Sequence, residues 1–271
     1  MKATVAHLPH RSLRYFESGG GRDVVLLHAF PLSADQWLPQ LHRVPPGFRF
    51  IAPDLRGFRG MGAAYEDPGL AAGLSIEDYA RDVIALAAHL ELDRFIVCGL
   101  SMGGYVAFAL QRLAPNRVAG LILSNTRAGA DSADGRAGRD RMIALAGQEG
   151  PEAIAREMVP RLLGETTRRE QPDLADAVRR LVVVNSVEGI VTALGALRDR
   201  PDSTPGLGTI ACPTLVITGD EDAIIPVSEA ETMQRGIPNA SLVVLPQVGH
   251  LSNLEAPSAW SLALEAGLNA M

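Results

Sequence analysis

The chain has 271 residues, of which 47% are hydrophobic and 21% charged, and a formal net charge of −6. That length and apolar content predict one large α/β domain, or one domain with an insertion, and exclude a disordered chain. The acidic balance argues against binding to nucleic acid, and no apolar run approaches the roughly 18 residues that a membrane span needs.

The N-terminal residues and the cysteines bear on the cellular compartment. Residues 1–20 lack an apolar stretch, so we expect no signal peptide. Cys98 and Cys212 lie inside or beside apolar segments, which favours buried free thiols over a disulfide. Together these features predict a cytoplasmic protein.

Short runs rich in Val, Ile and Leu alternate with segments of helical periodicity. The runs lack apolar/polar alternation, as expected of strands that helices cover on both faces. The predicted strands are residues 24–28, 48–52, 94–99, 118–124, 214–218 and 241–245. The predicted helices are residues 76–92, with Ser75 as N-cap, and 102–114, 228–236 and 257–270. This order predicts a mostly parallel, doubly wound sheet.

The alternation is interrupted once, between residues 128 and 208. No convincing strand occurs there, and four helical segments follow one another at 134–147, 152–163, 172–185 and 187–198. A helical insertion between two strands predicts a cap over the carboxyl edge of the sheet. We therefore expect an α/β core formed by 1–127 and 209–271, and a helical cap at 128–208.

The strongest motif lies between the third predicted strand and the helix after it, and reads Gly99-Leu-Ser101-Met-Gly103-Gly104. A G-x-S-x-G match alone is weak, but a turn from strand to helix is the context that a nucleophilic serine needs. The glycines let strand and helix approach each other, while the tight turn exposes Ser101. The backbone N–H of Met102, at the start of the helix, would then face an oxyanion.

A nucleophilic serine needs a general base and an acid that orients the base. Among the six histidines we favour His250, because it follows the last predicted strand, at the edge of the sheet where Ser101 lies. The loop after strand 214–218 offers Asp220 and Asp222 as the acid. We favour Asp222, which lies further into the loop, and Asp220 remains the alternative.

The loop after strand 24–28 is expected to supply a second oxyanion donor, the backbone N–H of Phe30. His28, in the same segment, is interpreted as a structural hydrogen-bonding residue and not as a second base. The spacing of His7 and His10 suggests a metal site, but no third ligand is near in the sequence. We expect neither a metal nor a cofactor.

Taken together, these motifs resemble the α/β-hydrolase superfamily over nearly the whole chain. His28-Ala-Phe-Pro31 resembles the H-G-F-P oxyanion loop of that family, and residues 52–57 resemble its A-x-D-x-R-G segment. Gly99–Gly104 resembles G-x-S-M-G-G, and Asp222 and His250 complete the chain order Ser, Asp, His. The nearest branches are the cofactor-free haloperoxidase/aryl-esterase and 3-oxoadipate enol-lactonase groups.

Two segments depart from the family pattern. Ala29 stands where the family usually has glycine, which can alter the oxyanion loop. The loop 58–66 lacks the usual G-x-S after Gly57, so the sequence leaves its conformation open.

The resemblance implies a serine hydrolase that cleaves a small carboxylic ester through an acyl-enzyme. In that chemistry Ser101 attacks the acyl carbon, His250 moves the proton, Asp222 orients His250, and the N–H groups of Phe30 and Met102 stabilise the oxyanion. An enol-lactonase or perhydrolase-type activity on the same residues is an alternative, and so is a ligand receptor with slow turnover. The expected partner is a small ester or lactone; the sequence leaves the oligomeric state open.

The aromatic residues are unevenly placed, because residues 109–259 contain none. Aromatic groups in the pocket must come from elsewhere, with Phe30 and Trp37 the nearest candidates. The cap is therefore predicted to form an apolar, adaptable lid without an aromatic cage. Candidate lid residues, which core packing explains equally well, are Met142, Met158, Leu162 and Ile190. Arg127, just before the insertion, could bind a substrate carboxylate, but an ion pair with a neighbouring Asp is favoured.

Overall fold

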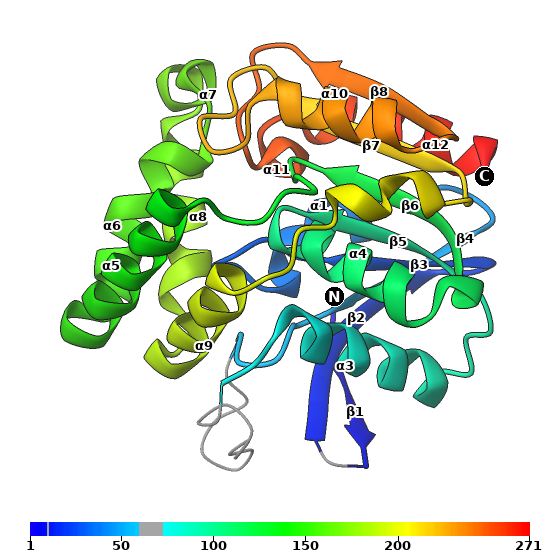
Figure 1. The fold of residues 1–271 in the computed structure, drawn as a ribbon, viewed down its shortest axis with the longest axis horizontal. Coiled ribbons are helices and arrows are strands. Elements are labelled where there is room, and N and C mark those ends of the chain that lie inside the picture. The colour runs from blue at the N-terminus through cyan, green and yellow to red at the C-terminus, as the bar shows by residue number, and fades with distance from the viewer. Residues whose placement is uncertain (10, 60–72) are drawn as a thin grey trace.

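The structure is a computed structural model, and it describes residues 1–9, 11–59 and 73–271. Within these residues an eight-stranded sheet has the order β1-β2-β4-β3-β5-β6-β7-β8. The pairs β1–β2 and β2–β4 are antiparallel, and all other neighbours are parallel. Helices α3 and α4 pack together against one face of the sheet, and α1 and α12 against the other (Figure 1). The predicted α/β-hydrolase fold with its mostly parallel sheet is confirmed.

Every strand predicted from the sequence is present, with bounds within two residues of those expected. The strands are β1 (Thr4–Leu8), β2 (Arg11–Gly19), β3 (Arg22–Leu27), β4 (Phe48–Pro53), β5 (Phe95–Leu100), β6 (Val118–Ser124), β7 (Thr214–Gly219) and β8 (Ala240–Leu245). The helices of the core are α1 (Leu38–Leu41), α3 (Ile76–His89), α4 (Met102–Leu113), α10 (Val227–Gly236), α11 (Ser252–Glu255) and α12 (Pro257–Ala270).

No sequence pattern predicted β1 and β2, the two strands at one edge of the sheet. Buried and exposed residues interleave along both strands, so neither forms the continuous apolar run that marks the central strands. Val5 and His7, on one face of β1, are exposed, so that face of the edge is open to solvent. Only strands that are covered on both faces have the continuous apolar runs by which strands were predicted.

Helix α3 shows how local sequence sets an element's bounds. Ser75 and Asp78 form a capping box, in which the Ser75 N–H donates to Asp78 Oδ2 over 2.9 Å and Ser75 Oγ accepts from the Asp78 N–H. The helix ends at His89, before the expected residue 92, because Glu91 takes a positive φ of 57°. His89, which lies inside the predicted helix 76–92, is thus in the last turn of α3.

Five helices lie between β6 and β7 and form a group beside the sheet, at the left of Figure 1. They are α5 (Ala133–Glu149), α6 (Pro151–Leu162), α7 (Glu165–Glu170), α8 (Pro172–Val183) and α9 (Val187–Arg198). The four predicted helices of the insertion are present. Helix α7 was missed because its sequence, Glu-Thr-Thr-Arg-Arg-Glu, has no apolar periodicity. The domain boundaries at 128 and 208 remain a prediction.

Candidate active site

Ser101 occupies the tight turn between β5 and α4, with φ 54° and ψ −110°. A non-glycine residue rarely adopts this region, so the serine is held in a strained conformation. Its backbone is held on both sides: the Ser101 N–H donates to Ser124 O over 2.9 Å, and Thr126 Oγ1 donates to Ser101 O over 2.8 Å. A Cβ on Gly103 would overlap the Leu27 carbonyl, so the glycine lets the helix approach β3.

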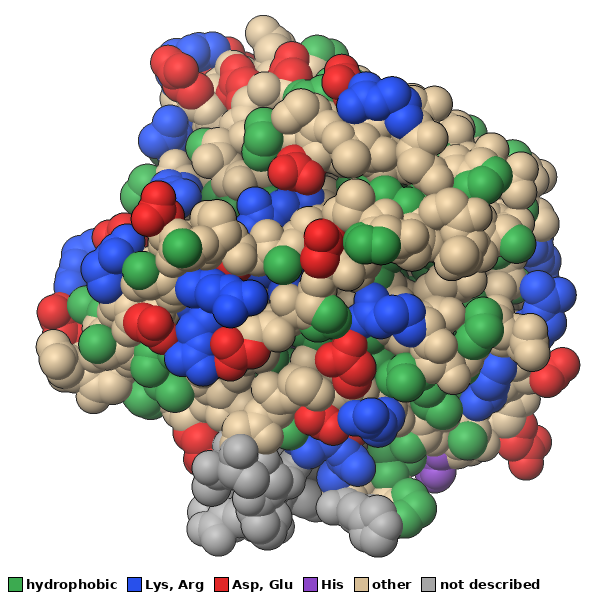
Figure 2. All heavy atoms as spheres, in the orientation of Figure 1, with side chains coloured by type: hydrophobic (Ala, Val, Ile, Leu, Met, Phe, Trp, Pro, Cys, Tyr) green, Lys and Arg blue, Asp and Glu red, His purple; other side chains and the backbone are tan. Residues whose placement is uncertain are grey.

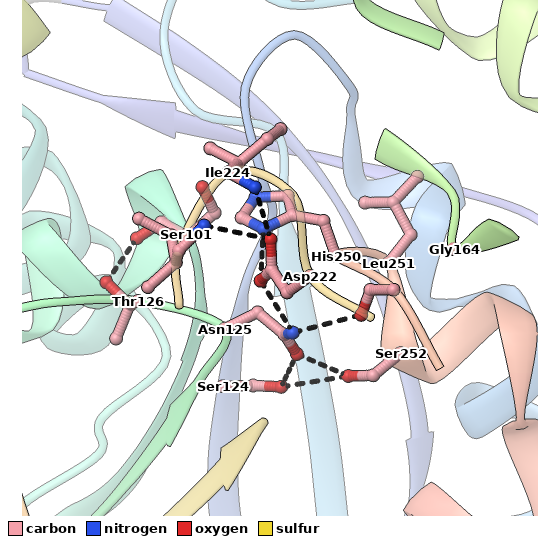
Figure 3. Close-up of polar contacts among 12 residues, drawn as sticks. Ser101, Ser124, Asn125, Thr126, Gly164, Asp222, Ile224, His250, Leu251 and Ser252 are labelled. Atoms are coloured by element: carbon pink, nitrogen blue, oxygen red, sulfur yellow. Dashed lines mark hydrogen bonds and ion pairs between the residues drawn. The ribbon is translucent and has the colours of Figure 1, made fainter. Parts of the chain in front are cut away.

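Asp222 and His250 form a buried pair, as Figure 3 shows. His250 Nδ1 lies 2.7 Å from Asp222 Oδ2, and the two side chains are 1% and 0% exposed. Asp222 Oδ1 accepts the backbone N–H groups of Ile224 and Ile225 over 2.8 and 2.9 Å. Burial alone would raise the pKa of Asp222, but the charge and hydrogen bond of His250 outweigh it and hold that pKa below the usual range. The carboxylate is therefore ionised at neutral pH and fixes the orientation of the imidazole.

The rival acid, Asp220, lies outside this pair. Its Oδ1 accepts the backbone N–H of Gln247. It therefore fastens the loop after β8 without facing His250.

Asn125, directly after β6, holds the acid from the other side (Figure 3). Its Nδ2 donates to Asp222 Oδ2 over 3.0 Å and to Gly249 O over 3.1 Å. Its Oδ1 accepts from the hydroxyls of Ser252 and Ser124, over 2.5 and 3.1 Å. All these groups are buried, so the amide has no freedom to turn. Asn125 was not predicted from the sequence, because an acid that orients the base was expected to be a carboxylate.

Glu255, the last residue of α11, fastens the loop that carries His250. One carboxylate oxygen accepts the N–H groups of Gly164 and Gly249 over 2.8 and 3.0 Å, and the other accepts that of Leu251 over 2.9 Å. Gly164 belongs to the helical insertion, so this buried carboxylate joins the insertion to the histidine loop. No sequence signal marked it, because its partners are all backbone groups.

The backbone N–H groups of Phe30 and Met102 lie in the loop after β3 and at the first residue of α4. Among the described residues neither N–H has a hydrogen-bond acceptor. Ala29 has no positive φ, so alanine fits where the family usually has glycine. His28 has the structural role expected of it: its Nδ1 lies 2.9 Å from Ala29 O, and its Nε2 accepts the Leu55 N–H over 2.9 Å. Burial lowers the pKa of His28 to about 4, so the ring is neutral.

A cavity of about 610 Å³ opens onto these groups. It is lined by Ser101, His250 and Phe30, together with residues of α4, α5, α6 and the loop after β7. A second hollow, of about 740 Å³, lies between α3 and α9 and is lined by none of the predicted catalytic residues. Ser101, Asn125, Asp222 and His250 follow the carboxyl ends of four neighbouring strands, the edge where open α/β sheets bind ligands.

The sequence model described as the alpha/beta hydrolase family matches residues 24–263. The chain belongs to the alpha/beta hydrolase family. Among solved structures it is similar to a thermophilic esterase from Thermogutta terrifontis in a malate-bound form. That similarity has 38% identity and a TM-score of 0.92, and covers 100% of this hydrolase and 99% of the esterase chain.

Relatives among curated proteins carry several names. A 3-oxoadipate enol-lactonase 2 from Acinetobacter baylyi is 30% identical, over 90% of this hydrolase and 87% of the lactonase. A Synechocystis protein that bears the name non-heme chloroperoxidase is 29% identical over 88% of both chains. An acetyltransferase component of the acetoin cleaving system from Pseudomonas putida is 31% identical over 93% of this chain, which spans 65% of its length. The resemblance to the haloperoxidase and enol-lactonase branches is thus confirmed.

The walls of the hydrolase cavity correct the predicted apolar lid. Met142 and Met158 line the cavity, whereas Leu162 and Ile190 are buried outside its lining. The insertion also contributes charged wall residues, which are Asp131, Asp134, Arg139, Arg141, Glu157 and Arg161. Basic and acidic side chains interleave over the helices at the left of Figure 2. The absence of aromatic residues from this segment said nothing about charge, so the prediction from aromatic content alone was wrong.

The aromatic members of the lining also differ from those expected. Phe30 lines the cavity, but Trp37 is fully buried and packs on Trp260, with ring centroids 5.4 Å apart. Tyr105, on α4, lines the cavity in its place. Helical spacing in the sequence did not tell which face of α4 turns toward the cavity, so Tyr105 was missed.

Four remaining expectations concern other parts of the hydrolase. Cys98 and Cys212 are free; Cys98 is buried, while Cys212 is only partly covered. The predicted loop 58–66 lies outside the described residues from position 60, and so does His10 of the His7–His10 pair. Within the described chain no single helix is long and apolar enough to cross a membrane; only α8 and α9 taken together, bent by 96°, meet that criterion.

Proposed function

We propose that this hydrolase cleaves a small carboxylic ester with Ser101 as nucleophile, His250 as general base and acid, and Asp222 as the group that orients His250. Ser101 Oγ attacks the acyl carbon, and its proton passes to His250 Nε2. His250 then gives that proton to the leaving alkoxide, which departs as an alcohol. Water, deprotonated by His250, attacks the acyl-enzyme; the bond from the acyl carbon to Ser101 Oγ breaks, Ser101 Oγ takes the proton back from His250, and the acid is released. No metal or cofactor enters these steps.

The observation that carries this proposal is the 2.7 Å contact between His250 Nδ1 and Asp222 Oδ2. His250 also lines the cavity together with Ser101. With Nδ1 held by the carboxylate, Nε2 is left as the basic nitrogen. The N–H groups of Phe30 and Met102, each without an acceptor among the described residues, are suited to the oxyanion. Such a donor contributes about 3–4 kcal/mol to transition-state stabilisation.

Hydrolysis of p-nitrophenyl acetate tests the proposal. Ser101→Ala is expected to lose at least about a thousand-fold in kcat, since removal of a nucleophilic serine disables the whole triad. Ser258→Ala, an exposed serine on α12, serves as the matched control and keeps the wild-type rate. Equal rates for the wild type and Ser101→Ala would refute the assignment.

An enol-lactonase activity is the second candidate. It is supported by the 30% identical relative that bears this name, and it needs no residue beyond those given above. A lactone opens by the same attack, but its leaving oxygen stays tethered to the acyl group. Comparing kcat/KM for α-angelica lactone, a five-carbon enol lactone, with the values for its saturated counterpart γ-valerolactone and for methyl pentanoate separates the two activities: a preference for the enol lactone over both favours the second candidate.

A further inference from the structure

Three arginines form ion pairs with a single aspartate, Asp131, at the wall of the cavity. Asp131, with a side chain only 1% exposed, contacts Arg127 Nη2 over 2.5 Å, Arg139 Nε over 3.0 Å and Arg200 Nη1 over 2.9 Å. Arg127 therefore makes the ion pair favoured from the sequence. Burial alone would raise the pKa of Asp131, but the charges of Arg139 and Arg200 hold it below the usual range. One ionised carboxylate thus meets three guanidinium groups.

Arg200 has a structural position behind the cavity wall. Its side chain is 2% exposed, and it donates to the carbonyls of Leu197 and Gly129 over 2.8 and 2.9 Å. Its guanidinium carbon lies 4.2 Å from the centre of the Tyr105 ring, which itself lines the cavity. Arg200 Nε is buried without a hydrogen-bond partner, but Arg200 is not among the residues that line this cavity. It therefore adds positive charge behind the wall without reaching a ligand there.

Arg127 and Arg139, by contrast, line the same cavity as Ser101 and His250. Their side chains are 24% and 21% exposed, and each uses one nitrogen on Asp131. Among the described residues, Nη1 of Arg127 and both Nη atoms of Arg139 have no hydrogen-bond acceptor, and Nε of Arg127 is buried without one. Asp131 thus holds both guanidinium groups in place, and N–H donors of Arg127 and Arg139 remain available to another acceptor.

The other charged residues of the cavity lining do not cancel the positive charge that Arg127 and Arg139 have in excess of Asp131. Arg141 and Arg161 are balanced by Asp134 and Glu157, so the lining keeps a net positive charge, with Arg200 behind it. The whole chain has a formal net charge of −6, so this local sign is opposite to that of the molecule. A partly desolvated positive wall with unused N–H donors favours an anion, and guanidinium groups bind carboxylates through paired hydrogen bonds.

We propose that Arg127 and Arg139, held by Asp131, bind a carboxylate of the substrate, so that the substrate is a small ester or lactone with a second, ionised carboxyl group remote from the scissile bond. This inference rests on the proposed function, because it places the reacting carbonyl at Ser101. A cavity of about 610 Å³ is of the size that holds a small-molecule ligand.

Monomethyl adipate and methyl hexanoate test the inference, because they share the methyl ester and chain length and differ in the terminal carboxylate. The wild type is expected to favour monomethyl adipate by about ten-fold or more in kcat/KM, the effect of a charge-assisted hydrogen bond. Arg127→Gln and Arg139→Gln should each lower that ratio by about ten-fold, mainly through KM. Arg136→Gln, an exposed arginine on α5, removes the same charge and should leave the ratio unchanged.

Binding of adipate, measured by calorimetry on Ser101→Ala, tests the same subsite without turnover. We expect binding that Arg139→Gln weakens by about ten-fold and Arg136→Gln leaves unchanged. The inference is overturned if the wild type prefers methyl hexanoate, if the arginine variants lower both esters equally, or if adipate does not bind. If adipate binds as expected but the wild type hydrolyses neither ester, the proposed function fails and the anion subsite stands.

Discussion

Replacing Asn125 by Asp puts a second carboxyl group beside Asp222, with little change in shape. Asn125 Nδ2 lies 3.0 Å from Asp222 Oδ2, the oxygen that also faces His250. The hydroxyls of Ser252 and Ser124, which contact the amide oxygen, can donate to a carboxyl oxygen equally well. What the variant loses is one of the two N–H donors of the amide, since a single carboxyl proton cannot be donated to both Asp222 Oδ2 and Gly249 O.

The protonation state of the new pair decides its effect on catalysis. With one proton between the two carboxyl groups, the residue at 125 donates to Asp222 as the amide does, and the orientation of His250 is kept. When that proton is lost, two unit charges face each other at about 3 Å, which at an effective dielectric constant of about 20 costs about 5 kcal/mol. This repulsion raises the pKa for loss of the last proton, displacing it by up to about 4 pH units. Activity is therefore kept in mild acid and lost as the pH rises.

The assay measures kcat/KM for a methyl ester as a function of pH. Hydrolysis is monitored by titrating the acid that it releases. The wild type has no carboxyl pair here, so Asn125→Asp should show an additional loss of activity on the alkaline side. Asn125→Gly is the control: it accepts the positive φ of 45° and lacks the second carboxyl, so its loss should not depend on pH. A profile of Asn125→Asp parallel to that of the wild type would refute the reasoning.

Three further predictions concern stability. Gly103→Ala should lower the free energy of unfolding by about 2 kcal/mol or more in urea titration, since its Cβ overlaps the Leu27 carbonyl; an unchanged value contradicts the close approach. Asp131→Asn should cost about 3 kcal/mol at neutral pH by leaving buried Arg200 unpaired. Because the pKa of Asp131 is lowered in the folded state, this difference should shrink as the pH falls; a constant difference opposes it. The pKa of His28 is lowered to about 4 in the folded protein. On acidification the ring is therefore protonated in the unfolded chain before it is protonated in the folded one. The stability of the wild type relative to His28→Gln should therefore fall by about 3 kcal/mol from about pH 6.5 to about pH 4, and a flat difference would exclude a buried neutral ring.

The sequence located Ser101, Asp222 and His250 because each follows a strand with a continuous apolar run. Parallel strands bring their carboxyl ends to one edge, so position after a strand is already spatial information. Asn125 also follows a strand, β6, but an uncharged amide in that position carries no sign of its role. Its function as a donor to Asp222 follows only from the register of β6 against β7.

Other parts of the site depend on packing that no local pattern encodes. Glu255 has only backbone partners around the histidine loop, and these come together only when the insertion contacts the core. Trp37 was expected near the cavity from its place in the chain, but it packs on Trp260 from the far end of the sequence. The charged wall was not predicted, because three of its residues, Asp134, Arg139 and Arg141, lie on α5. Polar and apolar residues do not separate into two faces on this helix, so its sequence does not tell which side chains line the cavity.

Trapping the acyl-enzyme tests the central claim, that Ser101 is the nucleophile of this hydrolase. The protein is mixed with p-nitrophenyl acetate, quenched rapidly in acid, digested and analysed by mass spectrometry. We predict a transient acetyl group on the peptide that contains Ser101, and none on that peptide in Ser101→Ala. Turnover with the acetyl group on another residue, or with no covalent intermediate at any time, would contradict the account.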